Sequence, residues 1–485
     1  MHSRPHIALV GVPGSVGRAL SGALVGSFQV RALFQAAESH EEGPGIQVRP
    51  LDPFSLLESE KALKGVDVAV YLAHSRVPAA RLTQGRPQDL ELIAADNFAR
   101  AARRAGVRRI VYLGSLLPEG PATSERLRSR RELEEAVASS GVPVTVLRVG
   151  LVVGAGSPSF EILFRLVRRL PVVPCPGWTS HRTQPIALAD VLRMITACLE
   201  HPEAAGVAVD LGGPEIVTYL ELLERTARSM SLRRRFLDLP GGRSRPSALW
   251  LHLVSQAPAE LVRWLVEGLA HDLLPRDRQL QQALIGEGTP LDTAIDAAVR
   301  PQAATVNLLD WNGRAPAAST VCSVQRLPRP EAWTAGNVAV EFFRWLPAAL
   351  RPFLRVTVTP QGICSFFISF LPWPLLILEL QPERSSPDRV LLFVTGGLLV
   401  RYHPKGRLEF REMLRGRFVL TAVFEFQPRL PWFLYVITQA IAHLAVMLAF
   451  GRHLRDLPPG TPPPQLRDSN WQVDQGRGAV SGEEA

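Results

Sequence analysis

The chain has 485 residues, of which 46% are hydrophobic and 20% are charged. This length is enough for two or three domains with buried cores, and the composition excludes an intrinsically disordered chain. The formal net charge is +9, but only Lys61, Lys64 and Lys405 are lysines, so the basic charge comes almost entirely from arginine.

The four cysteines lie far apart, at Cys175, Cys198, Cys322 and Cys364. None of their spacings is that of a metal-binding pair, so we expect neither a metal site nor a disulfide framework. The arginine clusters at 100–109 and 126–131 fall on solvent faces and ends of predicted helices. They therefore predict solvated surfaces and no nucleic-acid partner, while a weak attraction to anionic membrane surfaces stays open.

The chain begins with the pattern of a dinucleotide-binding unit. An apolar run at 6–10 leads into Gly11-x-x-Gly14-x-x-Gly17, and a helical pattern follows. In such units the first glycine permits a tight turn, the second lets the backbone approach a ligand, and the third lets the helix pack closely on the strand. The helix start then offers free N–H groups to a pyrophosphate. An ordinary turn without a ligand is the alternative, and the position directly after a strand favours the dinucleotide.

Strand and helix patterns alternate after this motif. The apolar periodicity predicts strands at 28–33, 46–48, 66–72, 109–114 and 144–149, and helices at 53–63, 89–105 and 123–139. Alternation of this kind predicts an α/β fold with a doubly wound parallel sheet of the Rossmann type. The part from 151 to 300 is less regular, and we expect it to form the substrate side of the cleft, with helices at 158–170 and 186–199 and a strand at 207–211.

A domain boundary is expected near 301–320, where Pro, Ala, Asn and Gly interrupt the periodic segments. We therefore assign 1–300 to a nucleotide-binding domain with its substrate-side part, 321–455 to a second α+β domain, and 456–485 to a disordered tail. The second domain has the patterns of antiparallel strands followed by one long helix, with strands at 390–394, 397–402, 407–411 and 418–426 and the helix at 431–453.

These motifs resemble the NmrA-like, atypical short-chain dehydrogenase/reductase family of NAD(P)-binding proteins. The resemblance covers roughly residues 5–300 and is carried by the glycine loop together with Leu51-Asp52-Pro53, Tyr71-Leu72-Ala73-His74-Ser75, Asn97-Phe98-Ala99 and Gly212-Gly213-Pro214-Glu215. Residues 321–455 are similar to the family's C-terminal domain of unknown function (DUF2867). This second similarity implies a helix-grip, START-like fold that holds a small lipophilic ligand.

The resemblance implies a site for NAD or NADP. Asp52 would contact the adenine, Leu72 and Ala73 would line the ribose side, and Asn97 would lie near the active site. The pyrophosphate would lie on the loop residues Gly11, Val12, Gly14, Ser15, Val16 and Gly17.

The type of nucleotide stays open in the sequence. Gln35 stands where relatives often place an arginine for the 2′-phosphate. No acidic residue clearly ends the second strand either, although Arg31 lies nearby.

Reductases of this superfamily use Tyr-x-x-x-Lys, in which the lysine lowers the pKa of the tyrosine and the phenol exchanges a proton with the substrate oxygen. None of the five tyrosines has a lysine four residues later, and Arg126 and Arg130 stand at the aligned positions. Arg130 still suits the cofactor ribose, but an arginine cannot replace an ionisable phenol. The candidate catalytic residues are Ser115, Arg130 and His74, with polar loop residues as the alternative for the serine and the histidine.

The apolar helix at 432–450 would span about 28 Å, nearly the thickness of a hydrocarbon core. Gln439 and His443 lie one turn apart on one of its faces, which suits a polar-lined cavity. The strands before the helix also need a cover for their apolar face. We therefore expect a buried helix gripping a curved sheet, with peripheral membrane contact as the alternative.

Two functions are compatible with this sequence. The first is an NAD(P)-dependent oxidoreductase or epimerase-like enzyme acting on a small or lipophilic substrate, which the resemblance favours. The second is a non-catalytic NAD(P)(H) sensor or assembly factor, which the missing Tyr-x-x-x-Lys favours. A cofactor-free lipid-binding protein is a third, and the glycine loop argues against it. The first apolar run is too short for a signal peptide, so we expect a cytoplasmic protein, with membrane association left open.

Overall fold

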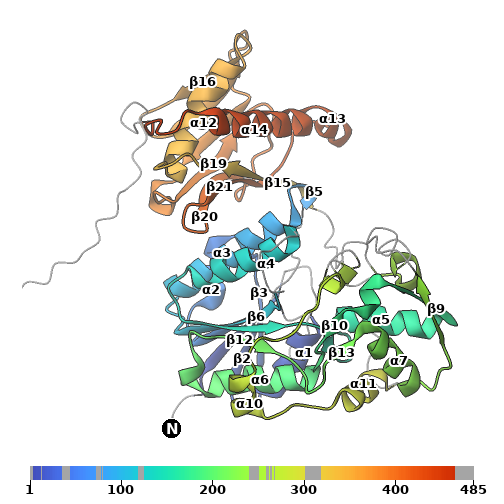
Figure 1. The fold of residues 1–485 in the computed structure, drawn as a ribbon. Coiled ribbons are helices and arrows are strands. Elements are labelled where there is room, and N and C mark those ends of the chain that lie inside the picture. The colour runs from blue at the N-terminus through green and yellow to red at the C-terminus, as the bar shows by residue number, and fades with distance from the viewer. Residues whose placement is uncertain are drawn as a thin grey trace, which may run out of the picture. The chain divides into compact units, whose positions relative to one another are not determined.

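The computed structural model describes residues 4–11, 14–34, 44–72, 78, 80–117, 125–239, 251–257, 262, 265–266, 268–300 and 318–464. The chain divides into two compact units (Figure 1). The amino-terminal unit consists of Met1–Ser75 and Leu92–Ala315, and the carboxy-terminal unit consists of Arg76–Glu91 and Pro316–Ala485.

The amino-terminal unit is built on a parallel sheet of seven strands, in the order β12-β7-β6-β4-β1-β2-β3. Ile7 in the central strand pairs with Val30 on one side and with Val68 on the other. After β3 the chain crosses to β4 on the other side of β1, so the switch point of the sheet lies between β1 and β4. Ligands of open parallel sheets bind at such a switch point, beyond the carboxyl ends of the strands. The strands are β1 (His6–Val10), β2 (Gln29–Phe34), β3 (Ile46–Pro50), β4 (Val68–Tyr71), β6 (Arg109–Ser115), β7 (Val144–Val149) and β12 (Ala208–Leu211).

Helices alternate with these strands, as the periodicity predicts: α1 (Ser15–Leu24), α2 (Leu56–Leu63), α3 (Pro87–Arg104), α4 (Glu125–Ala138) and α6 (Leu188–Glu200). α1 and α6 pack on one face of the sheet, where Leu9, Leu20 and Ile195 form part of one core and are 0% exposed. Central strands covered on both faces are nearly continuous in apolar residues, which is why 66–72 and 109–114 were recognisable as strands. The predicted Rossmann-type α/β fold is confirmed.

The substrate-side part of this unit has its own core, in which Phe160, Leu222 and Ile295 are buried together. The 3-10 turns are η1 (Gly177–Ser180) and η2 (Pro202–Ala204), and the helices are α5 (Pro158–Arg169), α7 (Tyr219–Ser229), α10 (Gln279–Ile285) and α11 (Leu291–Val299). The short strands are β8 (Val152–Val153), β9 (Val172–Pro176), β10 (Arg182–Thr183), β11 (Ile186–Ala187), β13 (Val217–Thr218) and β14 (Arg235–Leu239).

The carboxy-terminal unit contains a mixed sheet of eight strands, in the order β16-β17-β18-β19-β20-β21-β15-β5. Neighbouring strands are antiparallel except for β5, which runs parallel to β15 and pairs Leu82 with Val321. The strands are β5 (Ala80–Gln84), β15 (Ala318–Pro328), β16 (Leu354–Val358), β17 (Ile363–Ile368), β18 (Leu376–Leu380), β19 (Arg389–Gly396), β20 (Arg407–Met413) and β21 (Phe418–Phe426). β5 lies within the range 1–300 that the sequence analysis assigned to the first domain.

Helices α12 (Ala335–Ala349), α13 (Trp432–Ile437) and α14 (Gln439–Asp456) accompany this sheet. α12 and α14 pack on the same face of the sheet (Figure 1). Phe342, Phe410 and Phe450 meet in the core there. The helical run breaks at Thr438. The unit is therefore α+β as expected, and the finer helix-grip, START-like description stays a prediction.

Two expectations about this unit are corrected. The predicted strand at 397–402 is a connection between β19 and β20, because Gly397 adopts a φ of +123° that ends the strand. The long apolar helix is buried on one face only, since 22% of its most apolar window is buried.

Candidate functional site

The loop after β1 makes the tight turn that its glycines predict. Gly11 has a φ of +101°, a conformation that side chains with a Cβ rarely adopt. The N–H of Gly14 donates to the carbonyl oxygen of Gly11 at 3.2 Å and closes the turn. Val12 and Pro13 lie outside the described residues.

The start of α1 offers backbone donors at the carboxyl edge of the sheet. Gly14 is the N-cap, without a capping side chain, and the first turn has no acidic residue. The first intrahelical bond runs from the N–H of Arg18 to the carbonyl oxygen of Gly14 at 3.0 Å. The N–H groups of Ser15, Val16 and Gly17 therefore precede the helical ladder and lie at the positive end of the helix dipole. This arrangement suits an anion such as a pyrophosphate.

The reason for a glycine at position 14 bears on whether this turn binds a ligand. A Cβ built on this residue would lie 3.4 Å from the carbonyl oxygen of Gly11, which is an ordinary van der Waals contact, and its φ of −66° is open to any residue. The packing of the described residues therefore does not require glycine at this position. Close approach of a ligand to the backbone would be a reason for glycine here.

Asp52 and Asn97 belong to one local arrangement. Asp52 follows β3, and its carboxylate accepts the N–H of Phe54 at 3.0 Å. Asn97 on α3 is 0% exposed, and its Nδ2 donates to the carbonyl oxygen of Pro53 at 2.9 Å. Its Oδ1 is buried without a hydrogen-bond partner among the described residues. Asn97 thus holds the turn that carries Asp52, a link that the sequence analysis did not anticipate.

Leu72 and Ser115 lie at the same edge as the glycine turn. The N–H of Leu72 donates to the carbonyl oxygen of Val10 at 2.8 Å, which fixes the end of β4 beside the end of β1. Ser115 is the last residue of β6, the next strand of the sheet. Arg130 lies on α4 and is 8% exposed. The structure therefore places Leu72 and Ser115 at the edge of the sheet where we expect the cofactor, and the role of Arg130 stays a prediction.

Several other sequence candidates fall outside the described residues. These are Ala73, His74 and Gln35, together with the side chain of Arg126. Their assignments stay predictions.

The tyrosines of the central sheet are core residues. Tyr71 stacks on Phe98 with a centroid distance of 4.5 Å and lies 5.9 Å from the ring of Tyr112. The two tyrosines are 4% and 2% exposed. Neither is therefore placed to exchange a proton with a substrate.

Arg31 has a structural partner at the end of a helix. Its Nη1 donates to the carbonyl oxygens of Ala62 and Lys64 at 3.0 and 2.8 Å, so it caps the carboxyl end of α2. Burial and the neighbouring Arg49 hold the pKa of this guanidinium below its usual value. Its presence near the end of β2 is explained without a 2′-phosphate.

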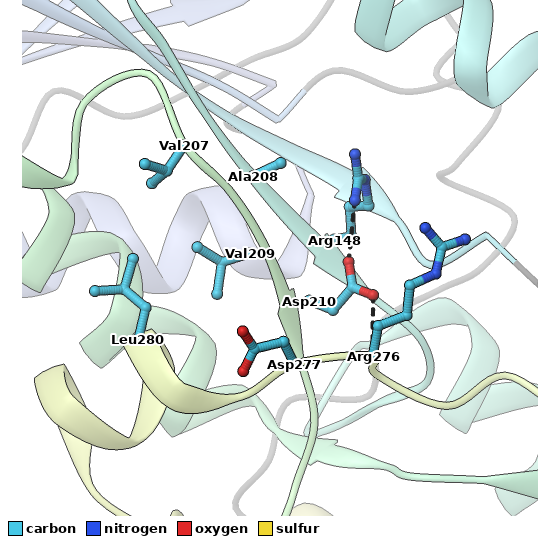
Figure 2. A pocket seen from close by; sticks show the side chains of 8 residues that line it. All are labelled: Arg148, Val207, Ala208, Val209, Asp210, Arg276, Asp277 and Leu280. Carbon is cyan, nitrogen blue, oxygen red and sulfur yellow. Dashed lines mark hydrogen bonds and ion pairs between the residues drawn. The ribbon is translucent and has the colours of Figure 1, made fainter.

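A pocket of about 220 Å³ opens beside β12, an outermost strand of the same sheet. Figure 2 shows Asp210 between Arg148 and Arg276, where it accepts a hydrogen bond from each residue at 3.2 Å. Arg148 also pairs with Glu134, and the bond to this carboxylate raises the pKa of its guanidinium. β7, β6 and β4 separate this pocket from β1, so it is distinct from the glycine turn. Its charged groups hold the edge strand in place.

The described residues contain no group of His, Cys, Asp and Glu that could hold a metal ion. All four cysteines are free and buried. Burial raises the pKa of the Cys175 and Cys198 thiols to about 11, so neither is a thiolate near pH 7.

Comparison with known proteins agrees with this geometry. Residues 11–202 match the NAD(P)H-binding family. The chain is 27% identical over 294 residues to a protein named ceramide reductase from Caulobacter vibrioides, covering 59% of this chain and 90% of that protein. It is 29% identical over 240 residues to a (4-alkanoyl-5-oxo-2,5-dihydrofuran-3-yl)methyl phosphate reductase from Streptomyces griseus, covering 48% and 77%.

A solved structure shares the fold. A nucleoside-diphosphate-sugar epimerase from Staphylococcus aureus superposes with a TM-score of 0.50 at 17% identity, covering 60% of this chain and 99% of the other. The amino-terminal unit thus contains an NAD(P)-binding domain of the Rossmann type, and NAD or NADP as the cofactor is confirmed at that level. The chain is similar to reductases and epimerases of the short-chain dehydrogenase/reductase type.

Proposed function

We propose that this protein is an NAD(P)H-dependent reductase acting on a carbonyl group of a lipophilic substrate. The observation that carries the proposal is the glycine turn and open helix start at the switch point of the sheet, with Ser115 at the same edge. The similarity to a named ceramide reductase over 90% of that protein's length supports a lipophilic substrate.

The chain's own residues would bind and orient the two reactants. The N–H groups of Ser15, Val16 and Gly17 would hold the pyrophosphate, and Asp52 would contact the adenine. The bound dinucleotide supplies the hydride. The hydroxyl of Ser115 would donate a hydrogen bond to the substrate oxygen, where negative charge develops.

The proton needs a donor other than the usual tyrosine. Tyr71 and Tyr112 are buried in the core, and a guanidinium group is not a proton donor in proteins. His74 comes two residues after Leu72 and is the candidate donor, because a histidine titrates near neutral pH. We expect His74→Asn to lower kcat while cofactor affinity stays unchanged.

The experiment combines binding with turnover. NADPH and NADH are titrated by fluorescence, and the loss of reduced nicotinamide is then followed with matched long-chain and short-chain ketones and aldehydes. We expect turnover that favours the long-chain compounds, and Ser115→Ala to lower kcat by about 100-fold with unchanged cofactor affinity. Ser139→Ala, at the exposed end of α4, is the matched control.

A second function is favoured by the arginines at 126 and 130. A protein that binds NAD(P)(H) without reducing a substrate would act as a sensor or an assembly factor. Cofactor binding without turnover on any compound of the panel would support this function, and absence of cofactor binding would contradict both.

A further inference from the structure

Four connections of the carboxy-terminal unit meet at one end of its sheet, and we call them the loop end. They are 350–353 before β16, 369–375 between β17 and β18, 397–406 between β19 and β20, and 427–431 between β21 and α13. Backbone hydrogen bonds tie them together. The N–H of Ser369 donates to the carbonyl oxygen of Phe353 at 2.9 Å. The N–H groups of Leu398 and Arg429 donate to the carbonyl oxygens of Pro374 and Leu399, both at 3.0 Å.

The exposed large apolar side chains of this unit are concentrated around the loop end. Within the described part of this unit, every exposed large apolar side chain lies in the loop end or on α13 and α14. Phe370 is 75% exposed and Trp373 is 61% exposed. The full set is Leu350, Phe353, Phe370, Trp373, Leu398, Tyr402, Phe433, Leu434, Ile437, Ile441, Leu444 and Leu448. Clusters of this kind mark interaction sites.

The charges of the loop end have one sign. Its four connections contain Arg351, Arg401, Lys405 and Arg429, all exposed, and no aspartate or glutamate. The connections at the opposite end of the sheet are mixed, since they carry Glu331, Glu383 and Asp388 beside their arginines. The charged side chains of these four connections are therefore all cationic.

The helix beside the loop end continues the apolar surface. Trp432–Asp456 is long and apolar enough to cross a membrane, by length and composition only. Its inner face contributes Tyr435, Met447 and Phe450 to the core, so it is held against the sheet. The exposed apolar residues include Ile437 on α13 and Ile441 and Leu448 on α14, which are 62%, 59% and 55% exposed. A helix that is apolar on both faces needs an apolar partner on the outside as well.

We propose that the loop end and the outer face of α13–α14 dock on the surface of an anionic lipid bilayer. Exposed aromatic side chains suit the level of the headgroups, apolar helix faces enter the boundary below it, and cations beside them attract anionic lipid. A second copy of the chain fits less well, because a two-fold contact through this surface would bring the same cations toward one another. Such docking would give access to lipophilic substrates. It does not depend on hydride transfer.

The test uses the full chain and sedimentation with vesicles. One set of vesicles is phosphatidylcholine alone, and the other contains phosphatidylglycerol as well. We expect binding to the anionic vesicles only, decreasing as salt rises. Arg401→Glu with Lys405→Glu should lower the partition coefficient by more than tenfold, since each cation near the surface contributes about fivefold. Arg233→Glu with Arg415→Glu, two exposed arginines elsewhere, changes the net charge equally and should have little effect.

The apolar contribution is tested separately. Phe370→Ser with Trp373→Ser should lower binding to anionic vesicles, whereas Leu57→Ser with Leu253→Ser, on exposed residues of the other unit, should not. Circular dichroism and NAD(P)H titration establish that each variant is folded. Equal binding of neutral and anionic vesicles, or equal binding by both charge variants, would overturn the proposal. A protein that binds no vesicles but forms a dimer, which Phe370→Ser with Trp373→Ser turns into a monomer, would also overturn it. Insertion into the bilayer that resists both salt and alkaline extraction would overturn it as well.

Discussion

Gly11 and Gly14 have different physical reasons to be glycine. The positive φ of Gly11 is costly for any side chain, whereas Gly14 has an ordinary backbone conformation. We expect Gly11→Ala to lower the free energy of unfolding by about 1–2 kcal/mol. Gly14→Ala should leave stability nearly unchanged and weaken NAD(P)H binding, and Gly14→Asp should abolish binding. Urea denaturation and fluorescence titration measure the two effects. Equal destabilisation by both alanine variants would contradict this assignment.

His443 should make the stability of the protein depend on pH. Burial lowers the pKa of its imidazole to about 4, and its Nε2 has no hydrogen-bond partner among the described residues. The unfolded chain, with a pKa near 6.5, then binds a proton that the folded chain does not, so stability is lost as the pH falls from about 6.5 toward 4. We expect His443→Leu to remove on the order of 3 kcal/mol of that dependence, measured by urea denaturation at pH 7 and pH 4.5. Parallel pH profiles for both proteins would contradict it.

At this scale the sequence identified residue types better than their partners. The glycine spacing predicted a turn that the structure contains. The sequence left the type of nucleotide open with Arg31 near the second strand, and Arg31 caps α2 in the structure. The sequence also did not suggest that Asn97 holds the Asp52 turn. Both contacts join residues more than thirty positions apart, and local patterns contain no information about them.

Strand β20 carries a buried charge cluster that the sequence analysis did not detect. Glu409 accepts hydrogen bonds from Nε of Arg389 at 2.7 Å and Nε of Arg411 at 2.6 Å. Burial alone would raise the pKa of this carboxyl, but the two guanidinium groups hold it well below its usual range. Its contribution to stability is therefore present above about pH 4.3 and is lost as the pH falls further.

We expect Glu409→Gln to lower the free energy of unfolding at pH 7 by about 3–5 kcal/mol, because it removes a carboxylate that pairs with two buried guanidinium groups. Glu379→Gln, an exposed residue on β18, is the control and should change stability by less than about 0.5 kcal/mol. A loss of the same small size for both would show that the cluster is well solvated.

Element prediction succeeded where the signal is local. The mostly apolar runs of β6 and β7 and the periodicity of α5 predict boundaries within one or two residues of those observed. β5 was missed because Ala80–Gln84 alternates only weakly and is a strand through its pairing with β15. The run at 397–402 has the composition of a strand, but Gly397 ends it.

At the scale of the whole molecule, the division of the chain is not a division of the sequence into two blocks. Arg76–Glu91 belongs to the carboxy-terminal unit, where Asp89 pairs with Arg326 at 2.8 Å and Gln84 donates to the carbonyl oxygen of Ala440 at 3.1 Å. The composition predicts the boundary near 301–320. No change in composition marks the segment Arg76–Glu91, where the chain enters the carboxy-terminal unit for the first time.

A fragment of residues 316–485 should therefore be incomplete. It lacks β5, so β15 becomes an open edge that favours aggregation. We expect it to unfold at lower urea concentration than the same fragment with residues 78–91 joined by a flexible linker. A fusion with a scrambled 78–91 sequence is the control, and equal midpoints for all three fragments would contradict the contribution of β5.

The position of β5 early in the chain also has consequences for the synthesis of the protein and for recombination of its gene. A ribosome completes Ala80–Gln84 more than 200 residues before it begins the partner strand Ala318–Pro328, so β5 stays unpaired during about half of translation. A single recombination event between two genes cannot transfer the whole carboxy-terminal unit without residues 92–315 of the other unit. A gene that gains only residues 316–485 encodes a sheet without its edge strand β5.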